Sequence, residues 1–450
     1  MKTIKITLVL SILLLVLSNF SYAQSFIVKI SGQITNVKSN TASIKDQNRV
    51  VKVISIHEDG SFSDSLDVLN TGFYSFVYSR ESTKIYLSDG YNLKIKLNTA
   101  EFDETIKYSG KGAECNNFLA AKFLVNESVF GDYSDYKLEE KDFLNLRDSV
   151  QMVYTEMLSI VDDKEFVDFE KQALYYSNLV AIKNYKPYHS YFSKKLGFQP
   201  SNNLTKRFEN LDYSNAKDYQ NYGAYKTLVN SYYLGGMRST TNYDSVLTVI
   251  KSIESLEIKE GVTQELLSYL SIDNDHVFEI YTSIKRVCTD PEFLESCTEK
   301  YDSFQHLLKG NPSPKFAYKD VNGKMVKLDD LKGKYVYIDV WATWCSPCLG
   351  EIPHLKKLEA DYHDKNIAFV SISVDNKNAY DKWKKMVADK ELKGYQLYAD
   401  KSWKSDFIQA YQIKGIPTFI LIDPQGNIVS ASAKRPSNPE LRLLFDELLK

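Results

Sequence analysis

The spacing of apolar residues changes twice along the chain, which divides it into regions of different secondary structure. Residues 25–110 contain segments in which apolar and polar residues alternate, such as "YNLKIKL" at residues 91–97. A period of two is typical of a β-strand with one buried face and one solvated face. The turn sequence Asp89-Gly90 separates this strand from "KIYL", so the two segments are predicted to form a β-hairpin.

Residues 113–308 instead repeat apolar residues every three or four positions, which is the spacing of one face of an α-helix. The predicted face in "FLNLRDSVQMVYTEMLSIV" consists of Phe143, Leu146, Val150, Val153, Met157, Ile160 and Val161. Another helix is predicted to begin at Asp290-Pro291, because Asp caps helices and Pro is tolerated in the first turn. The region is therefore predicted to be all-α, and no pattern in it indicates a chemical function.

The segment "KGNPSPK" at residues 309–315 combines glycine with two prolines and is predicted to be a linker. In residues 316–450, strands such as "YVYIDVWA" alternate with helical segments, which predicts an α/β domain. Its sheet is predicted to be largely parallel, covered on both faces, with an antiparallel hairpin at its edge. The fold class is thus multidomain, with a β-rich domain at 24–112, a helical domain at 113–308 and this α/β domain.

The first 23 residues have the three parts of a signal peptide. Lys2 and Lys5 form the positive end, an apolar stretch follows, and Ser21 and Ala23 provide small residues for cleavage before Gln24. The apolar stretch is too short for a stable membrane anchor, so we expect export to the periplasm or cell envelope without stable membrane insertion. The formal net charge of −2 gives no electrostatic reason to expect nucleic acid as a partner.

Cys345 and Cys348 are separated by two residues at the junction of a predicted strand and a predicted helix. A zinc site would need a second pair of ligands, and covalent haem would need His where Leu349 stands. A structural disulfide is the ordinary interpretation in an exported protein, but one that closes so short a loop restricts the unfolded chain very little. The remaining interpretation is a redox-active dithiol.

The junction itself favours a reactive thiol at Cys345. A sulfur at the start of a helix lies near unpaired backbone N–H groups and the positive end of the helix dipole, which stabilise a thiolate. In such motifs the thiol pKa can fall to about 7 or lower. Cys348 lies one turn further along the same face, where it can attack a mixed disulfide formed by Cys345.

The segments "DVWATWCSPC" and "KGIPTFILID" resemble the active site of thioredoxin and its partner loop. With the signal peptide, the "GEIP" after the cysteines and the added "IAFVSISVD" strand, they make residues 312–450 similar to the TlpA/ResA-like thiol-disulfide oxidoreductases of bacterial envelopes. The two upstream regions resemble, more loosely, the β-rich and helical extensions found before such domains. The resemblance implies a thioredoxin fold for the α/β domain, and neither a cofactor nor a metal is expected.

The resemblance also implies roles for residues around the cysteines. Cys345 would be the exposed nucleophile, and Cys348 would be the resolving thiol. Pro417 would be a cis-proline that faces the pair. Ile416, which precedes this proline, and Trp344 would contact the substrate.

Two carboxylates complete the residues that the resemblance assigns. Asp339 falls on the buried carboxylate position of thioredoxin, and Glu351 falls on the helix glutamate of the ResA-like branch. Burial raises the pKa of a thiol, so either carboxylate could take the proton of Cys348 and assist its attack. Ser346 between the cysteines departs from the Gly of thioredoxin and leaves the redox potential open.

We therefore expect an exported thiol-disulfide oxidoreductase that reduces disulfides of envelope proteins through Cys345 and Cys348. Its partners would be disulfide-bearing proteins and a membrane electron donor, since an oxidising envelope would re-oxidise the dithiol. Two alternatives stay open. One is a disulfide oxidase or isomerase, and the other is a substrate-binding envelope protein whose dithiol only senses the redox state.

Three further cysteines have no assigned role. In "CTDPEFLESC", a helix that begins at Asp290 would place Cys297 about 10 Å along its axis from Cys288. This separation exceeds the reach of a disulfide, and whether the two cysteines pair stays open. Cys115 is then the odd thiol and is expected to be buried.

The leader predicts a mature N-terminus at Gln24, which can cyclise once it is exposed. Intact-mass measurement of protein taken from the cell envelope should give the mass of residues 24–450. A mass that retains Met1, or one that carries a lipid adduct, would contradict this prediction.

Overall fold

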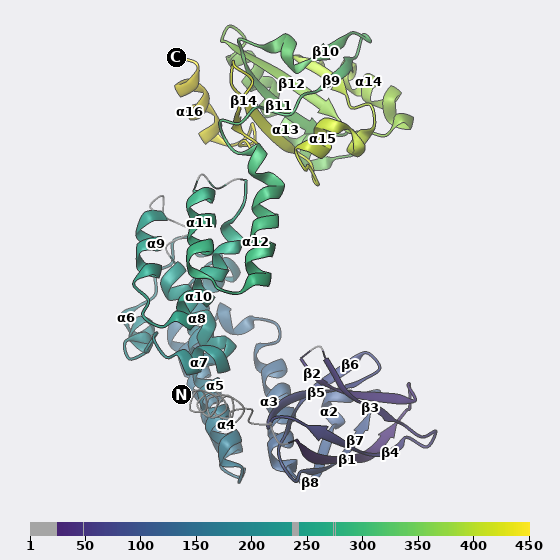
Figure 1. Cartoon of the computed structure of the whole chain (residues 1–450), viewed down its shortest axis with the longest axis vertical. Coiled ribbons are helices and arrows are strands. Elements are labelled where there is room, and N and C mark those ends of the chain that lie inside the picture. The colour runs from purple at the N-terminus through teal and green to yellow at the C-terminus, as the bar shows by residue number, and fades with distance from the viewer. Residues whose placement is uncertain (1–24, 48, 236–242, 273, 275) are drawn as a thin grey trace, which may run out of the picture. The chain divides into compact units, whose positions relative to one another are not determined.

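The computed structural model describes residues 25–47, 49–235, 243–272, 274 and 276–450 (Figure 1). The chain forms two compact units, one up to Leu228 and one from Val229 onward. The signal peptide expected at residues 1–23 lies outside the described residues. Within the described ranges, no helix combines the length and the apolar character that crossing a membrane requires.

The first unit begins with two four-stranded β-sheets. One sheet has the order β4 (Ser61–Val68), β1 (Phe26–Thr35), β7 (Asn92–Asn98), β8 (Lys107–Lys111). The other has the order β3 (Arg49–Ser55), β2 (Thr41–Asp46), β5 (Gly72–Tyr78), β6 (Glu81–Leu87). Side chains from both sheets, including Ile30 and Phe76, share one apolar core. The β-rich region predicted from the alternating pattern is therefore present.

The predicted hairpin between "KIYL" and "YNLKIKL" is wrong. β6 pairs with β5 in one sheet, whereas β7 pairs with β1 and β8 in the other. The turn at Asp89-Gly90 is present, with a φ of 68° at Gly90, but it carries the chain from one sheet to the other. An alternating pattern gives a strand its buried face and does not specify its partner strand.

Three long helices follow, which are α3 (Ala113–Phe130), α4 (Glu140–Leu158) and α5 (Lys164–Phe192). The predicted apolar face of α4 is partly wrong, because Val153 is 44% exposed whereas Tyr154 and Leu158 are buried. The Tyr154 hydroxyl donates to Asn126 Oδ1 on α3 at 2.8 Å. A buried tyrosine whose hydroxyl has a partner behaves as an apolar residue, and this shifts the buried stripe away from Val153.

Shorter helices occur in the first unit and at the start of the second. They are α2 (Phe102–Thr105), α6 (Asn202–Thr205), α7 (Ala216–Asn221), α8 (Gly223–Leu234), α9 (Tyr243–Lys251), α10 (Leu256–Glu265), α11 (Val277–Val287) and α12 (Pro291–Phe304). As predicted, α12 follows an Asp290 cap, whose carboxylate accepts the N–H of Glu292 at 3.0 Å. Cys288, Cys297 and Cys115 are buried free thiols, so the structure contains no Cys288–Cys297 disulfide.

A seven-stranded sheet forms the centre of the C-terminal domain. Its order is β10 (Met325–Lys327), β9 (Ala317–Asp320), β13 (Tyr395–Tyr398), β12 (Ile367–Ser373), β11 (Tyr335–Trp341), β14 (Thr418–Ile422), β15 (Ile428–Ser430). Among these described strands, only β11–β12 and β12–β13 are parallel, so the prediction of a largely parallel sheet is wrong. Short connections at both edges join β9 to β10 and β14 to β15, and such connections produce antiparallel pairs.

Helices cover both faces of this sheet. Ile338 and Val340 of β11 pack in a core with α14 (Tyr380–Asp389) and α15 (Asp406–Ala410). Tyr337 of β11 packs with α13 (Ser346–Asp361) and α16 (Pro439–Leu448). Successive β11 residues therefore face opposite helical layers, as the alternation of a strand requires. This arrangement agrees with the thioredoxin fold that the resemblance implies.

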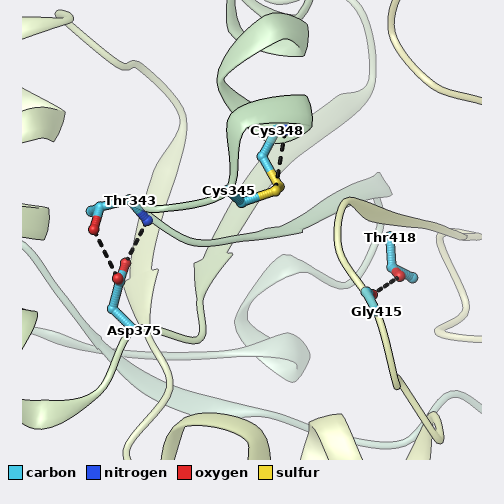
Figure 2. Close-up of a disulfide and its surroundings, with 6 residues drawn as sticks. All are labelled: Thr343, Cys345, Cys348, Asp375, Gly415 and Thr418. Atoms are coloured by element: carbon cyan, nitrogen blue, oxygen red, sulfur yellow. Dashed lines mark hydrogen bonds between the residues drawn. A yellow bond between two sulfur atoms is a disulfide. The ribbon is translucent and has the colours of Figure 1, made fainter.

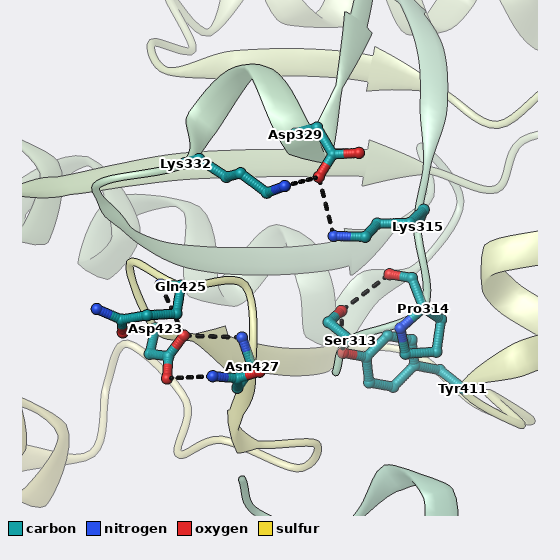
Figure 3. A network of polar contacts seen from close by, with 9 residues as sticks. All are labelled: Ser313, Pro314, Lys315, Asp329, Lys332, Tyr411, Asp423, Gln425 and Asn427. Atoms are coloured by element: carbon teal, nitrogen blue, oxygen red, sulfur yellow. Dashed lines mark hydrogen bonds and ion pairs between the residues drawn. The ribbon is translucent and has the colours of Figure 1, made fainter. Parts of the chain in front are cut away.

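Residues 309–315, which were predicted to be a linker, are hydrogen-bonded to the edge of this sheet. The backbone N–H of Gly310 donates to the Ile428 carbonyl of β15 at 2.8 Å. The Ser313 hydroxyl lies 2.7 Å from the Tyr411 hydroxyl (Figure 3). The segment is thus packed onto the C-terminal domain.

Candidate active site

Cys345 lies between the end of β11 and the start of α13. It occupies the cap position immediately before Ser346, the first helical residue. Its Sγ accepts the backbone N–H of Cys348 at 3.2 Å and is joined to Cys348 Sγ in a disulfide (Figure 2). In the reduced protein, the same N–H and the helix dipole would stabilise a thiolate at Cys345.

The two cysteines are equally buried in this disulfide form. Cys345 is 4% exposed and Cys348 is 3% exposed, whereas the resemblance implies an exposed Cys345. Both cysteines belong to a buried apolar cluster, and Ile416 packs against this cluster. The Ile416–Pro417 peptide bond is cis, which is the isomer that the resemblance implies. Trp344 is 56% exposed and offers an apolar surface directly beside Cys345.

A hydrogen bond closes the loop that contains the cis peptide bond. The Thr418 hydroxyl donates to the Gly415 carbonyl at 2.7 Å (Figure 2). Gly415 and Thr418 flank Ile416 and Pro417, so this bond fixes the backbone on either side of the two residues. The loop is thereby held in a defined conformation next to the cysteines.

Asp375 is a candidate positioning residue that the sequence analysis missed. Its side chain is fully buried, and its carboxylate accepts the Thr343 N–H at 2.9 Å and the Thr343 hydroxyl at 2.8 Å (Figure 2). The Ser373 hydroxyl donates to the same carboxylate at 2.8 Å. Thr343 lies two residues before Cys345, so Asp375 fixes the loop that presents the cysteine. The available signal was an acid at the end of the apolar strand "IAFVSISVD", where a charge requires partners.

Asp339 lies on the side of β11 that faces α13 and α16, and it is 9% exposed. Burial, with smaller contributions from the charges of Glu351 and Glu359, raises the pKa of its carboxyl to about 8. Ser371 is its neighbour across the parallel β11–β12 pair, and a hydrogen bond from Ser371 opposes the rise. A carboxyl with such a pKa exchanges its proton near neutral pH.

Glu351 is bound to the segment that precedes α16. Its carboxylate accepts the backbone N–H of Ser437 at 3.0 Å and the Ser437 hydroxyl at 2.8 Å. It lies one helical turn beyond Cys348 on α13, as its sequence position indicates. Its negative charge acts on Asp339, so the structure couples the two acids electrostatically.

Glu359 is a second acid that the sequence analysis missed. It lies further along α13 and is 8% exposed. Burial raises the pKa of its carboxyl to about 7, although Lys393 and Lys356 act in the opposite direction. One carboxylate oxygen lies 2.9 Å from the point where a Cβ atom on Gly394 would be, so a side chain at position 394 would displace it. No local sequence signal distinguished Glu359 from the solvated acids of a helix.

A polar row crosses the sheet beside Asp339. Ser371 of β12 pairs with Asp339 on one side and with Gln396 of β13 on the other. Gln396 is 5% exposed, and its Oε1 has no hydrogen-bond partner among the described residues. Three neighbouring strands thus place buried polar side chains in register on the face that α13 covers.

Comparison with known proteins identifies similar chains. The Redoxin family model matches residues 308–442. Thiol-disulfide oxidoreductase ResA from Bacillus cereus is 34% identical over 120 residues, which make up 27% of this chain and 66% of that protein. Thioredoxin-like protein YneN from Bacillus subtilis is 33% identical over 141 residues, which make up 31% of this chain and 80% of that protein.

A solved structure is also similar. The solution structure of a thiol-disulfide oxidoreductase from Bacteroides vulgatus shows 53% sequence identity, covers 31% of this chain and 90% of that one, and has a TM-score of 0.28. For the ResA protein from Bacillus cereus described above, the matched region spans 66% of that protein's length, or about two thirds.

Asp339→Asn should stabilise the oxidised C-terminal domain at pH 8, and the gain should shrink toward pH 4. The folded carboxyl keeps its proton up to about pH 8, whereas the unfolded one loses it near its ordinary pKa of 3.8. Wild-type stability therefore falls as the pH rises between these values, and removing the acid recovers a free energy of unfolding on the order of a few kcal/mol.

Denaturant unfolding followed by tryptophan fluorescence measures this effect. All four tryptophans lie within residues 341–403 and report on the C-terminal domain. The control is Asp389→Asn, because the Asp389 side chain is 58% exposed and its partner Lys385 stays charged from pH 4 to pH 8, so its effect should not change in this way with pH. If Asp339→Asn raised the free energy of unfolding equally at pH 4 and pH 8, the assignment of a buried, protonated carboxyl would be contradicted.

Proposed function

The chain belongs to the ResA-like thiol-disulfide oxidoreductases of thioredoxin fold, and from this premise we propose that it reduces disulfides of envelope proteins after export. The observation that carries the proposal is the Cys345 sulfur at the cap of α13, where it accepts the Cys348 N–H at 3.2 Å. This position favours a thiolate at neutral pH. The partners would be disulfide-bearing proteins and a membrane electron donor that regenerates the dithiol.

The reaction consists of two thiol-disulfide exchanges. The Cys345 thiolate attacks one sulfur of the substrate disulfide, which forms a mixed disulfide and releases the first substrate thiolate. The Cys348 thiolate then attacks Cys345 Sγ and releases the second substrate thiolate. Two electrons pass to the substrate, and the Cys345–Cys348 disulfide seen in the structure is the product form of the enzyme.

The surfaces around the cysteines support binding of a protein substrate. Trp344 is 56% exposed beside Cys345, and Ile416, in the loop closed by the Thr418–Gly415 bond, packs against the cluster that contains both cysteines. The backbone of this loop offers hydrogen-bonding groups to an extended peptide, and Trp344 offers an apolar contact. We assign Trp344, Ile416 and Pro417 to substrate binding.

The second exchange requires removal of the Cys348 proton. Asp339 is suited to accept it, because its raised pKa of about 8 lies near that of an ordinary thiol, about 8.5. Glu351 lies on the helix that carries Cys348 and acts on Asp339 through its charge. We assign Asp339 as the proton acceptor and Glu351 as the group that adjusts its pKa.

Trapping tests both the activity and the roles of the cysteines. Exported Cys348→Ser protein should accumulate mixed disulfides through Cys345, because the first exchange still occurs and the second cannot. Non-reducing electrophoresis with mass spectrometry identifies the trapped proteins, and the matched Cys345→Ser variant should trap none. Equal trapping by both variants would show that the assigned roles are wrong.

Two further measurements on the same protein distinguish the alternatives. A reduction potential near that of thioredoxin, about −270 mV, supports a reductase, whereas one near −120 mV supports an oxidase. Failure of the wild-type dithiol to reduce a generic protein disulfide would favour a binding protein with a redox-sensing pair.

The proton relay predicts a specific kinetic defect. In the wild type, resolution of the mixed disulfide should speed up as the pH rises through about 8, because Asp339 accepts a proton only as the carboxylate. Asp339→Asn should remove this dependence and slow resolution by about 10²–10⁴-fold, while attack by Cys345 stays nearly unchanged. Glu351→Gln should slow resolution to a smaller extent, and the double variant should resemble Asp339→Asn.

Stopped-flow turnover across pH separates the two exchanges. The control is Glu440→Gln, since Glu440 of α16 forms an exposed ion pair with Lys434. Resolution slowed by less than about tenfold in Asp339→Asn, a value below the range for a general base, would make the carboxylates structural.

A further inference from the structure

A cavity of about 200 Å³ lies between α3, α4 and α5 in the first unit. Two cationic side chains line it, Lys122 from α3 and Arg147 from α4, together with amide, hydroxyl and apolar groups of the three helices. The catalytic chemistry proposed above makes no use of these helices. The cavity is therefore a candidate for a function of the helical region itself.

Buried carboxylates are paired with both cations. Lys122 forms an ion pair with Glu170, whose side chain is 1% exposed, and Arg147 Nη1 lies 3.7 Å from the carboxylate of Asp135, which is also 1% exposed. Glu170 and Asp135 do not line the cavity. The charged side chains that line the cavity are thus cationic, and the carboxylates paired with them lie outside its lining.

Further contacts hold the Arg147 guanidinium in one orientation. Its Nε donates to Asn178 Oδ1 at 3.1 Å, and its central carbon lies 4.1 Å from the ring centroid of Phe130. Among the hydrogen bonds that the structure describes, Arg147 uses only Nε, because the 3.7 Å contact of Nη1 with Asp135 is longer than a hydrogen bond. The Nη1 and Nη2 groups can therefore donate to a ligand. A guanidinium fixed in this way loses little conformational entropy when it binds a planar partner.

The lining of the cavity has more hydrogen-bond donors than acceptors. The Oδ1 atoms of Asn178 and Asn126 accept from Arg147 and from the Tyr154 hydroxyl. Within the part of the chain that the structure describes, their amide N–H groups are not used and are available to a ligand. Among the bonds that the structure describes, Lys122 uses one of its three donors, on Glu170. A ligand that satisfies these groups must be rich in acceptors, and a carboxylate matches a guanidinium best.

Stability alone does not account for this arrangement. Buried ion pairs lose much of their attraction to desolvation, and apolar residues of similar size often give an equally stable or more stable core. Burial raises the pKa of the Asp135 carboxyl, although Arg147 acts in the opposite direction. Charged groups held in such a setting beside a cavity are typical of a binding site.

We propose that this cavity binds a small organic carboxylate. The carboxylate would accept hydrogen bonds from Arg147, Lys122 and the amides of Asn126 and Asn178. A short aliphatic portion would lie against Val150 and Leu174, which also line the cavity. At the volume of a liquid water, about 30 Å³ for each heavy atom, the cavity holds a ligand of roughly six or seven heavy atoms.

Sodium butyrate is the probe, because it has six heavy atoms and a single carboxylate, and butyramide is its neutral match in shape. Titration calorimetry and thermal unfolding of the full mature chain should show saturable binding of butyrate and a rise in Tm. Butyramide should bind at least tenfold more weakly. Inorganic phosphate should bind more weakly than butyrate, because it lacks the aliphatic portion.

Substitutions test whether butyrate binds in this cavity. Arg147→Gln should weaken butyrate binding at least tenfold, whereas Arg207→Gln should leave it unchanged, because Arg207 forms an exposed ion pair with Asp148 and does not line this cavity. If Arg147→Gln does not fold, Asn178→Ala provides the test. This variant removes an amide that lines the cavity and keeps the ion pairs of Lys122 and Arg147. It should weaken binding several-fold.

Three outcomes would overturn the proposal. They are equal binding of butyrate and butyramide, equal or tighter binding of phosphate, and butyrate binding that neither Arg147→Gln nor Asn178→Ala weakens. None of these outcomes bears on the Cys345/Cys348 chemistry, which is measured separately by trapping.

Discussion

The junction of β11 and α13 is the constraint on which the active site depends. β11 is buried on both faces, so its direction is fixed and the following loop must bring Cys345 to the first turn of the helix. The sulfur can then accept the N–H of Cys348, as it does at 3.2 Å. Asp375 holds this loop through both the N–H and the hydroxyl of Thr343. The burial of Asp375 is offset by these charge-assisted bonds.

The local features of the site could be predicted from the sequence because their causes are local. Two cysteines at the change from strand to helix indicate a thiol at a helix start, and Asp339 in an apolar strand indicates a buried acid. The position of Asp375 at the end of an apolar strand indicated a buried acid, but its role depends on Thr343, which is distant in the sequence. Glu359 had no local signal, and its contact with Gly394 is likewise distant. A pattern of spacing along one element contains no information about such contacts.

The same limit explains the errors in the fold. The alternating pattern located β6 and β7 correctly, yet the strands lie in different sheets because the pattern does not encode a partner. The predicted direction of the strands in the C-terminal sheet was wrong for a related reason. Alternating strands and helices indicated a parallel sheet, whereas hairpins at both edges and the antiparallel pairing of β11 with β14 make it mixed. Pairing is a non-local property that only the assembled core determines.

Asp339 and Asp135 are both buried acids, and the charged groups around each one determine which role its carboxyl group is suited to. The charges that act on Asp339 belong to Glu351 and Glu359, so burial and repulsion both raise its pKa, which suits it to the proton transfer proposed above. Asp135 is buried as well, but Arg147 lies 3.7 Å away and opposes the effect of burial. There the carboxylate serves to fix a cation beside a cavity. An acid buried without a cation suits proton transfer, whereas an acid buried with one suits the organisation of a binding site.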